Sequence, residues 1–171
     1  IPMAKNSKNA DIAAPDAAAE NTPGSRQLIV HAQYIKDLSF ENPNAPNVLT
    51  EDTAQPDVEI GVNVGATLIG DGQFEVLLNL TAKAKAGETA LFLVDLTYAG
   101  LVSAPNTPEA ELNPLIMIEA PRLLFPFARA IVSDMTRDGG FMPLNIQPVD
   151  FVAVYQHNLA RQQEAQQSER H

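Results

Sequence analysis

Apolar and polar side chains alternate with a period of two in three segments of the chain, at residues 28–34, 57–68 and 74–81, and residues 91–102 form a long, mostly apolar run that also predicts a strand. In the second of these, Val58 and Ile60 alternate with Asp57 and Glu59. Successive side chains of a strand point to opposite faces, so this period predicts β-strands. Turn signals at residues 70–72 (Gly-Asp-Gly) and at Gly87 leave only short links between the last three strands. Short links of this kind favour an antiparallel sheet.

After residue 106 the apolar period changes to three and four, which predicts helices in the last third of the chain. Residues 107–109 (Thr-Pro-Glu) have the order of an N-cap, a first-turn proline and a first-turn acid, and Pro114 is expected to restart this helix. The main helix is expected to open at Pro121 and to end at two glycines, residues 139–140, and Asp150 to cap a last helix. All strands precede all helices. The predicted fold class is therefore α+β, a four-stranded antiparallel sheet followed by helices packed on one face.

The two ends of the chain differ in composition from the middle. Residues 1–26 contain few large apolar side chains and several prolines, so a disordered arm is expected there. The stretch 161–171 is polar all round and is expected to be a fraying helix end or a flexible tail. One folded domain is expected over residues 27–160.

The last predicted strand is apolar on both faces. Phe92 and Val94 lie on one face by alternation, and Leu91 and Leu93 lie on the other. The helices of one domain can cover only one face, so some of this surface would stay exposed. Exposed apolar surface of that size usually marks association or binding. We therefore expect a homo-oligomer that still keeps apolar grooves open.

Charge and composition exclude several classes of partner. The 171 residues carry a formal net charge of −10, which disfavours binding to nucleic acid and to anionic lipid headgroups. No apolar run approaches the roughly 20 residues that span a bilayer, and no signal-peptide core is apparent. Cys is absent, as is common in reducing compartments. We therefore expect a cytoplasmic location without direct membrane insertion.

The sequence contains no recognisable catalytic, metal-binding or cofactor-binding motif. Its three histidines are His31, His157 and His171, and their spacing matches no metal motif. No serine stands in a Gly-x-Ser-x-Gly elbow, and no glycine-rich phosphate loop is present. Pairs of carboxylates occur in polar surroundings, where solvation is the ordinary role. We expect no enzyme activity, no catalytic residue, no metal and no cofactor.

The segment 34–46 (Tyr-Ile-Lys-Asp-Leu-Ser-Phe-Glu-Asn-Pro-Asn-Ala-Pro) ends in residues that cannot continue a strand ladder or a helix. It is expected to leave the first strand and to cross the surface as an extended, proline-stiffened segment. From the residues alone, Asp37 and Glu41 could simply be solvated loop acids.

This segment resembles the SecB family of protein-export chaperones. Three further segments match that family in the same order, at residues 88–90, 121–129 and 141–151. The resemblance covers about residues 26–160. It implies a four-stranded antiparallel sheet with helices behind it, assembled as a homotetramer that is a dimer of dimers. It also implies an ATP-independent chaperone that binds unfolded precursor proteins, keeps them translocation-competent and delivers them to the SecA motor.

The resemblance also assigns residues to partners. It places the SecA-facing surface at Asp37, Glu41, Leu93 and Asp95, where a basic, zinc-holding tail of SecA would bind. Client binding is implied, less sharply, at Phe92, Val94, Leu96, Tyr98, Phe125 and Phe127, for which a plain core or subunit-interface role is the alternative. A family relative dedicated to one partner, such as an antitoxin, is the alternative function.

Overall fold

The structure, a computed structural model, describes residues 27–50 and 56–168. The arm expected at residues 1–26 and the last three residues of the expected tail lie outside the described residues. Residues 161–168, also assigned to that tail, continue the last helix, α4 (Phe151–Ser168).

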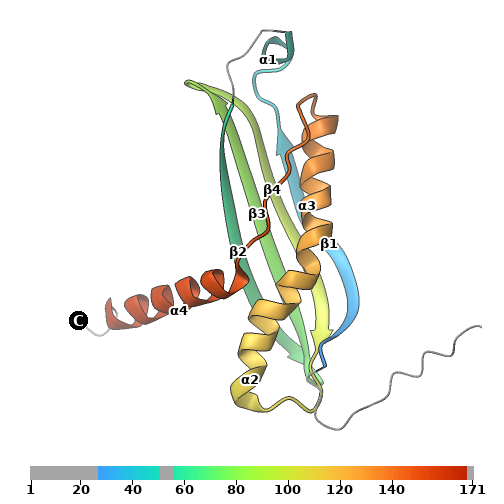
Figure 1. The fold of residues 1–171 in the computed structure, drawn as a ribbon, viewed down its shortest axis with the longest axis vertical. Coiled ribbons are helices and arrows are strands. Elements are labelled where there is room, and N and C mark those ends of the chain that lie inside the picture. Colours follow the sequence, from blue (N-terminus) through green and yellow to red (C-terminus); the bar gives the residue numbers. More distant parts are fainter. Residues whose placement is uncertain (1–26, 51–55, 169–171) are drawn as a thin grey trace, which may run out of the picture.

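Four antiparallel strands form one sheet, and they are β1 (Ile29–Glu41), β2 (Asp57–Gly70), β3 (Gln73–Ala86) and β4 (Thr89–Ser103). Their order in the sheet is β1-β4-β3-β2, so that β1 and β2 are the edge strands. Strands β2, β3 and β4 form a meander, whereas the short helix α1 (Asn47–Thr50) follows β1 at one end of the sheet (Figure 1). The predicted antiparallel sheet is confirmed.

Strand β1 is longer than the alternation predicted, and the expectation that the chain leaves the sheet at Tyr34 is wrong. The ladder continues to Phe40 opposite Val94 and Glu41 opposite Leu93. An edge strand tolerates charged residues because one of its sides faces water. The chain leaves the sheet only at residues 42–43, where proline has no N–H for the ladder.

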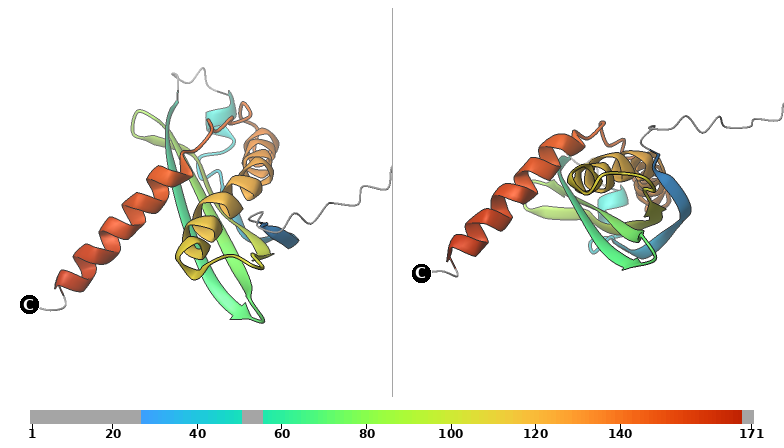
Figure 2. Two further views of the ribbon diagram at one scale, coloured as in Figure 1. Left: turned by 60° about the horizontal axis from the view of Figure 1, so that its bottom comes forward. Right: turned by 90° about the horizontal axis from the view of Figure 1, so that it is seen from below.

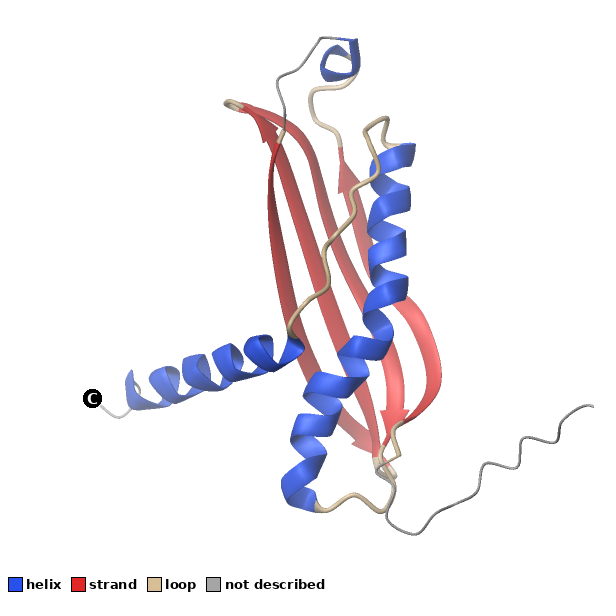
Figure 3. Ribbon diagram, viewed as in Figure 1, coloured by secondary structure: helices blue, strands red, loops and turns tan. Residues whose placement is uncertain are grey.

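The helical part begins with a single continuous segment made of α2 (Glu109–Pro114), the π-helical turn η1 (Leu115–Glu119) and α3 (Ala120–Asp138). It lies along one face of the sheet, while α4 points away from the body of the fold (Figures 1 and 3). The expected breaks at Pro114 and Pro121 are not made, because the residues at both junctions keep right-handed helical dihedrals. The π-helical turn takes up the irregularity without ending the helix.

The predicted helix ends are partly confirmed. Gly139 and Gly140 end α3, and Gly140 has a positive φ of 91° that suits glycine. Asp150 caps α4, since its Oδ1 accepts hydrogen bonds from the backbone N–H groups of Val152 at 3.0 Å and Ala153 at 3.1 Å. The Thr107 cap is not made: the N-cap of α2 is Pro108, and it has no side-chain cap bond.

The core lies between the sheet and the α2–η1–α3 segment. Its fully buried members come from β3, β4, η1, α3 and the start of α4, and they include Val76, Leu78, Leu80, Val94, Leu96, Ile116, Leu124, Val132 and Phe151. Burial of this apolar surface, at about 25 cal/mol per Å², is the main term that holds the helices on the sheet.

Gly100 of β4 allows the close approach of α3. A Cβ atom at this position would lie 2.8 Å from Leu124 Cδ2, and Leu124 is fully buried and has little room to move. Gly100→Val is therefore expected to lower the free energy of unfolding by about 1–3 kcal/mol, as measured by urea denaturation. Gly65→Val on β2 is the matched control, because no atom lies within 4 Å of a Cβ there. Equal losses in both variants would contradict the explanation.

Candidate partner-binding surfaces

The sheet has one face covered by helices and one face that no described helix covers (Figure 2). Along β4, Phe92, Val94 and Leu96 are buried toward the helices, while the alternate residues Leu93, Asp95 and Thr97 are half-buried on the other side. We call this second side the open sheet face.

The open sheet face brings together the four residues assigned to SecA binding. Glu41 lies opposite Leu93, and Ser39 lies opposite Asp95 in the next row. Asp37 lies opposite Thr97, one row further along. We call the set Asp37, Glu41, Leu93 and Asp95 the acidic face. Its two β1 acids are exposed, and its two β4 members are half-buried.

The three acids of the acidic face outnumber the one cation that the register places in their rows, Lys83 of β3, which lies opposite Leu93. Within the described residues no ion pair is made by Asp37, Glu41 or Asp95. Asp95 is oriented by β3, since Asn79 Nδ2 donates to Asp95 Oδ1 at 3.0 Å. The sequence alone did not point to Asn79. Its contact with Asp95 follows from the pairing of β3 with β4, in which Asn79 lies opposite Thr97. A surface of this kind attracts cationic groups.

The six residues assigned to clients lie mostly in the core. Val94 and Leu96 have no exposed surface beneath α3, so they cannot touch a client in this conformation. Phe92 and Phe125 are also buried, and Phe125 packs edge-on against Phe151 with ring centroids 5.8 Å apart. Phe127 is the exception, with 53% of its surface exposed.

Phe127 and Tyr98 lie in a shallow hollow of mixed polarity, which His31 and Gln33 also line. The two aromatic rings stack with centroids 6.5 Å apart, and Tyr98 Oη donates to Gln33 Oε1 at 3.3 Å. Together with Val30 and other β1 residues they line a space of about 370 Å³. Two of the predicted client residues therefore do share one surface hollow.

A deeper apolar groove lies at the other end of α3, and we call it the loop groove. It has a volume of about 380 Å³, and Phe92 lies within its lining. Its walls come from the connection after β1 and from the link between α3 and α4, and they include Val48, Leu49, Pro56, Val58, Leu91, Phe141, Met142 and Leu144. Leu49 and Met142 were not among the predicted client-binding residues. In the structure Met142 is 86% exposed.

Side-chain amides hold the connection after β1 in place as one wall of the loop groove. Asn42 Nδ2 donates to Gly139 O at 3.2 Å, and Asn44 Nδ2 donates to Ala90 O at 2.9 Å. Leu49 lies close against Gly140, where a Cβ would be 3.0 Å from its Cδ2. The groove thus depends on the end of α3 as well as on the loop.

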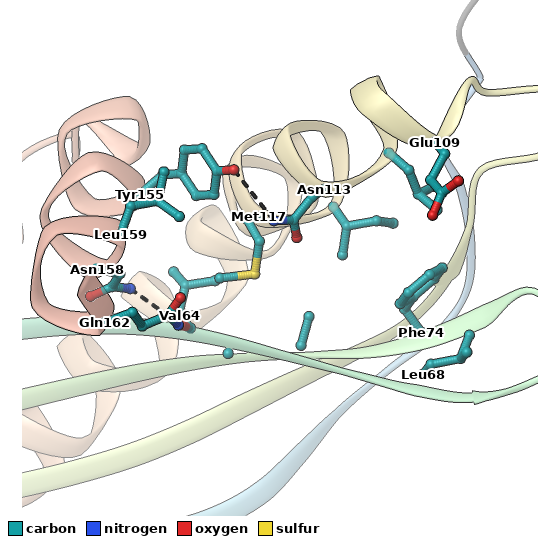
Figure 4. A pocket seen from close by; sticks show the side chains of 14 residues that line it. Val64, Leu68, Phe74, Glu109, Asn113, Met117, Tyr155, Asn158, Leu159 and Gln162 are labelled. Carbon is teal, nitrogen blue, oxygen red and sulfur yellow. Dashed lines mark hydrogen bonds between the residues drawn. The ribbon is translucent and has the colours of Figure 1, made fainter. Parts of the chain in front are cut away.

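A further cavity, of about 560 Å³, lies between β2, the α2–η1 segment and α4 (Figure 4). Its lining is mixed, because Met117 and Leu159 lie beside polar side chains, some of which pair with one another or with the backbone. Asn113 Nδ2 donates to Tyr155 Oη at 3.3 Å, and Asn158 Nδ2 donates to Val64 O at 3.4 Å. We call this the helix groove, and it is less apolar than the loop groove.

The described part of the chain has no cluster of three or more His, Cys, Asp or Glu side chains that could hold a metal ion. His31 instead lies with Nε2 2.7 Å from Ser103 Oγ on the open sheet face. Over the same residues, none of the helices combines the length and the apolar character that a membrane span requires.

Comparison with known proteins agrees with this architecture. The family model "SecB: Preprotein translocase subunit SecB" matches residues 20–162. A "Protein-export protein SecB" of Afipia carboxidovorans is 53% identical over 151 residues, which cover 88% of this chain and 94% of that protein. One of Hyphomonas neptunium, with the same name, is 50% identical over 159 residues, covering 89% and 93%.

A solved structure shares the fold. It is a SecB-like chaperone of Mycobacterium tuberculosis in complex with a ChAD peptide from the HigA1 antitoxin, with a TM-score of 0.56 and 18% sequence identity over 72% of this chain and 91% of that one. The match of the family model over most of the chain, with relatives about 50% identical along nearly their whole length, decides the assignment. This chain belongs to the SecB family.

Proposed function

We propose that this protein is a protein-export chaperone and not an enzyme. It binds unfolded precursor proteins in the cytosol without ATP, keeps them translocation-competent and delivers them to the SecA motor. The observation that carries the proposal is the similarity, over 88% of the chain, to a relative named "Protein-export protein SecB". Client binding is proposed to use the apolar grooves, and SecA binding is proposed to use the acidic face, which is a different surface.

Clients are proposed to bind in the apolar surface around α3. The loop groove offers mainly apolar walls to an unfolded segment, and the hollow at Tyr98 and Phe127 offers two aromatic rings beside polar side chains. Burial contributes about 25 cal/mol per Å² before ordering costs, and it requires no particular client sequence. A methionine such as Met142 suits this role because its side chain adapts to different shapes. Val94 and Leu96 support the grooves from the core.

SecA is proposed to bind the acidic face through a basic segment. Exposed charges at such a contact mainly set the association rate and are screened by salt. We therefore expect the affinity for SecA to fall steadily as NaCl is raised from about 0.05 to 0.5 M, whereas binding of an unfolded client changes little. Isothermal titration at several salt concentrations measures both. Equal salt dependence for SecA and client would contradict the division of surfaces.

The chain is proposed to assemble as a homotetramer, a dimer of dimers. The support is apolar surface that the single chain leaves exposed at Ile35 on β1 and Leu123 on α3. The tetramer is expected in sedimentation at micromolar concentration. A monomer under those conditions would refute the assembly.

Light scattering tests the chaperone activity. An unfolded precursor diluted from denaturant is expected to aggregate alone and to stay in solution with an excess of this protein, without nucleotide. Unchanged aggregation at excess protein would refute the proposal.

A chaperone dedicated to one partner, such as an antitoxin, is the second candidate. It is less supported, because the relatives about 50% identical to this chain are named for protein export. A pull-down from cells distinguishes the two. Many secreted precursors are expected, and dominance by one protein that is not exported would favour the dedicated role.

A further inference from the structure

We propose that Glu75 is a positioning residue for the acidic face: it holds Lys36 away from Asp37, so that the face keeps its negative charge for a cationic partner. This inference rests on the proposed binding of SecA to the acidic face. It concerns a residue on β3, outside the segments that carry the family resemblance.

A β-bulge places Lys36 on the open sheet face. The register between β1 and β4 shifts between Ile35, which pairs with Tyr98, and Asp37, which pairs with Thr97. Lys36 is the extra residue. In a regular strand the side chains of two successive residues point to opposite faces, but a bulge redirects one of them. Lys36 and Asp37 therefore share the open sheet face.

Glu75 binds Lys36 with both carboxylate oxygens. Lys36 Nζ lies 2.7 Å from Oε1 and 2.7 Å from Oε2, and Tyr34 Oη also donates to Oε1. Glu75 belongs to β3 and lies opposite Leu101 of β4. The contacts that join Lys36 and Tyr34 of the edge strand β1 to Glu75 therefore pass over β4. The hydrogen bonds from Lys36 and then from Tyr34 hold the pKa of Glu75 below its usual value, which keeps the carboxylate charged.

The Glu75 side chain is only 16% exposed, whereas that of Lys36 is 44% exposed. Ala99 of β4 lies opposite Tyr34 and is fully buried. Its small side chain leaves room above β4 for the contacts of Tyr34 and Lys36 with Glu75. The ammonium group is thus fixed at one end of the open sheet face by two hydrogen bonds, away from the rows that hold Asp95 and Glu41.

Loss of Glu75 would release a flexible cation next to the acidic face. Asp37 is the adjacent acid on the same face, and among the described residues no cation, Lys36 included, forms an ion pair with it. A released Lys36 would offset the charge of Asp37 and repel a basic segment. The sequence Lys36-Asp37 alone would suggest such mutual neutralisation, and the contact with Glu75 prevents it.

The test measures SecA affinity at low salt for three variants. Glu75→Gln is expected to weaken binding about threefold, in the range of an exposed ion pair. Adding Lys36→Gln is expected to restore wild-type affinity, because the released cation is gone. Glu59→Gln is the matched control: it removes one exposed acid from the same sheet face, on β2, and is expected to change affinity by less than half as much.

The outcomes separate this inference from simpler explanations. If the double variant binds as weakly as Glu75→Gln, the effect is structural and the inference fails. If Glu59→Gln weakens binding as much as Glu75→Gln, net charge accounts for the result and the inference also fails. Asp37→Lys is measured in parallel: a loss of SecA affinity there together with no effect of Glu75→Gln overturns this inference alone, and no effect of Asp37→Lys overturns the proposed acidic face as well.

Discussion

Replacing Asp37 or Asp95 with lysine is expected to weaken SecA binding about tenfold or more at low salt, while assembly and client binding stay intact. The reason is that each change reverses a charge within a surface whose acids have no ion pair among the described residues. A factor of ten corresponds to about 1.4 kcal/mol, a reasonable size for reversing a charge that a cationic partner faces. Titration of SecA against each variant measures the effect.

Asp134→Lys is the matched control for these reversals. Asp134 is an exposed acid on α3, on the opposite side from the acidic face, and its ion pair with Arg137 is a surface pair of small value. The control has the same change in net charge and should bind SecA normally. Loss of tetramer, client binding and SecA binding together in Asp37→Lys would point to misfolding and would contradict the assigned role.

Placing charges in the loop groove is expected to abolish most of the client-holding activity. Leu49 and Met142 are exposed, so Leu49→Glu combined with Met142→Glu should leave the core unchanged. Each exchange removes apolar surface worth about 1.5–3 kcal/mol when a client buries it, so client affinity should fall at least tenfold. Aggregation of an unfolded precursor, followed by light scattering, measures the loss.

Ile69→Glu is the control for the loop groove. Ile69 is an exposed apolar residue at the end of β2 and belongs to none of the three groove linings described above. It should leave client holding unchanged, and SecA affinity should be unchanged in both variants. Full chaperone activity in the Leu49 and Met142 variant would show that clients are held elsewhere.

Local patterns in the sequence predicted much of the fold. Alternation in β2 and β4 identified the strands and the faces of most side chains, and Asp150 correctly predicted the start of α4. The face predicted for Leu91, opposite to Phe92, is wrong: Leu91 is the extra residue of a bulge and lines the loop groove beside Phe92. The continuation of β1 to Glu41 was missed because acids and nearby prolines resemble a loop signal, although an edge strand tolerates them. The π-helical turn η1 was missed because no local residue type specifies it.

The surfaces could be predicted only in part, since they depend on contacts between distant segments. Alternation placed Val94 and Leu96 on one face of the strand. It could not show that α3 packs on this face and buries both side chains in the core, so that they line no groove. The loop groove combines Leu49 with Met142, two residues far apart in sequence. The interaction of Lys36 with Glu75 depends on a bulge that has no clear sequence signal.

Native mass spectrometry with an unfolded precursor and SecA tests the central claim most directly. We predict a tetramer alone, a heavier species when the precursor is added, and a still heavier species containing tetramer, precursor and SecA together, because client and motor use different surfaces. A chain that binds no precursor, or a precursor that is displaced whenever SecA binds, would contradict this account.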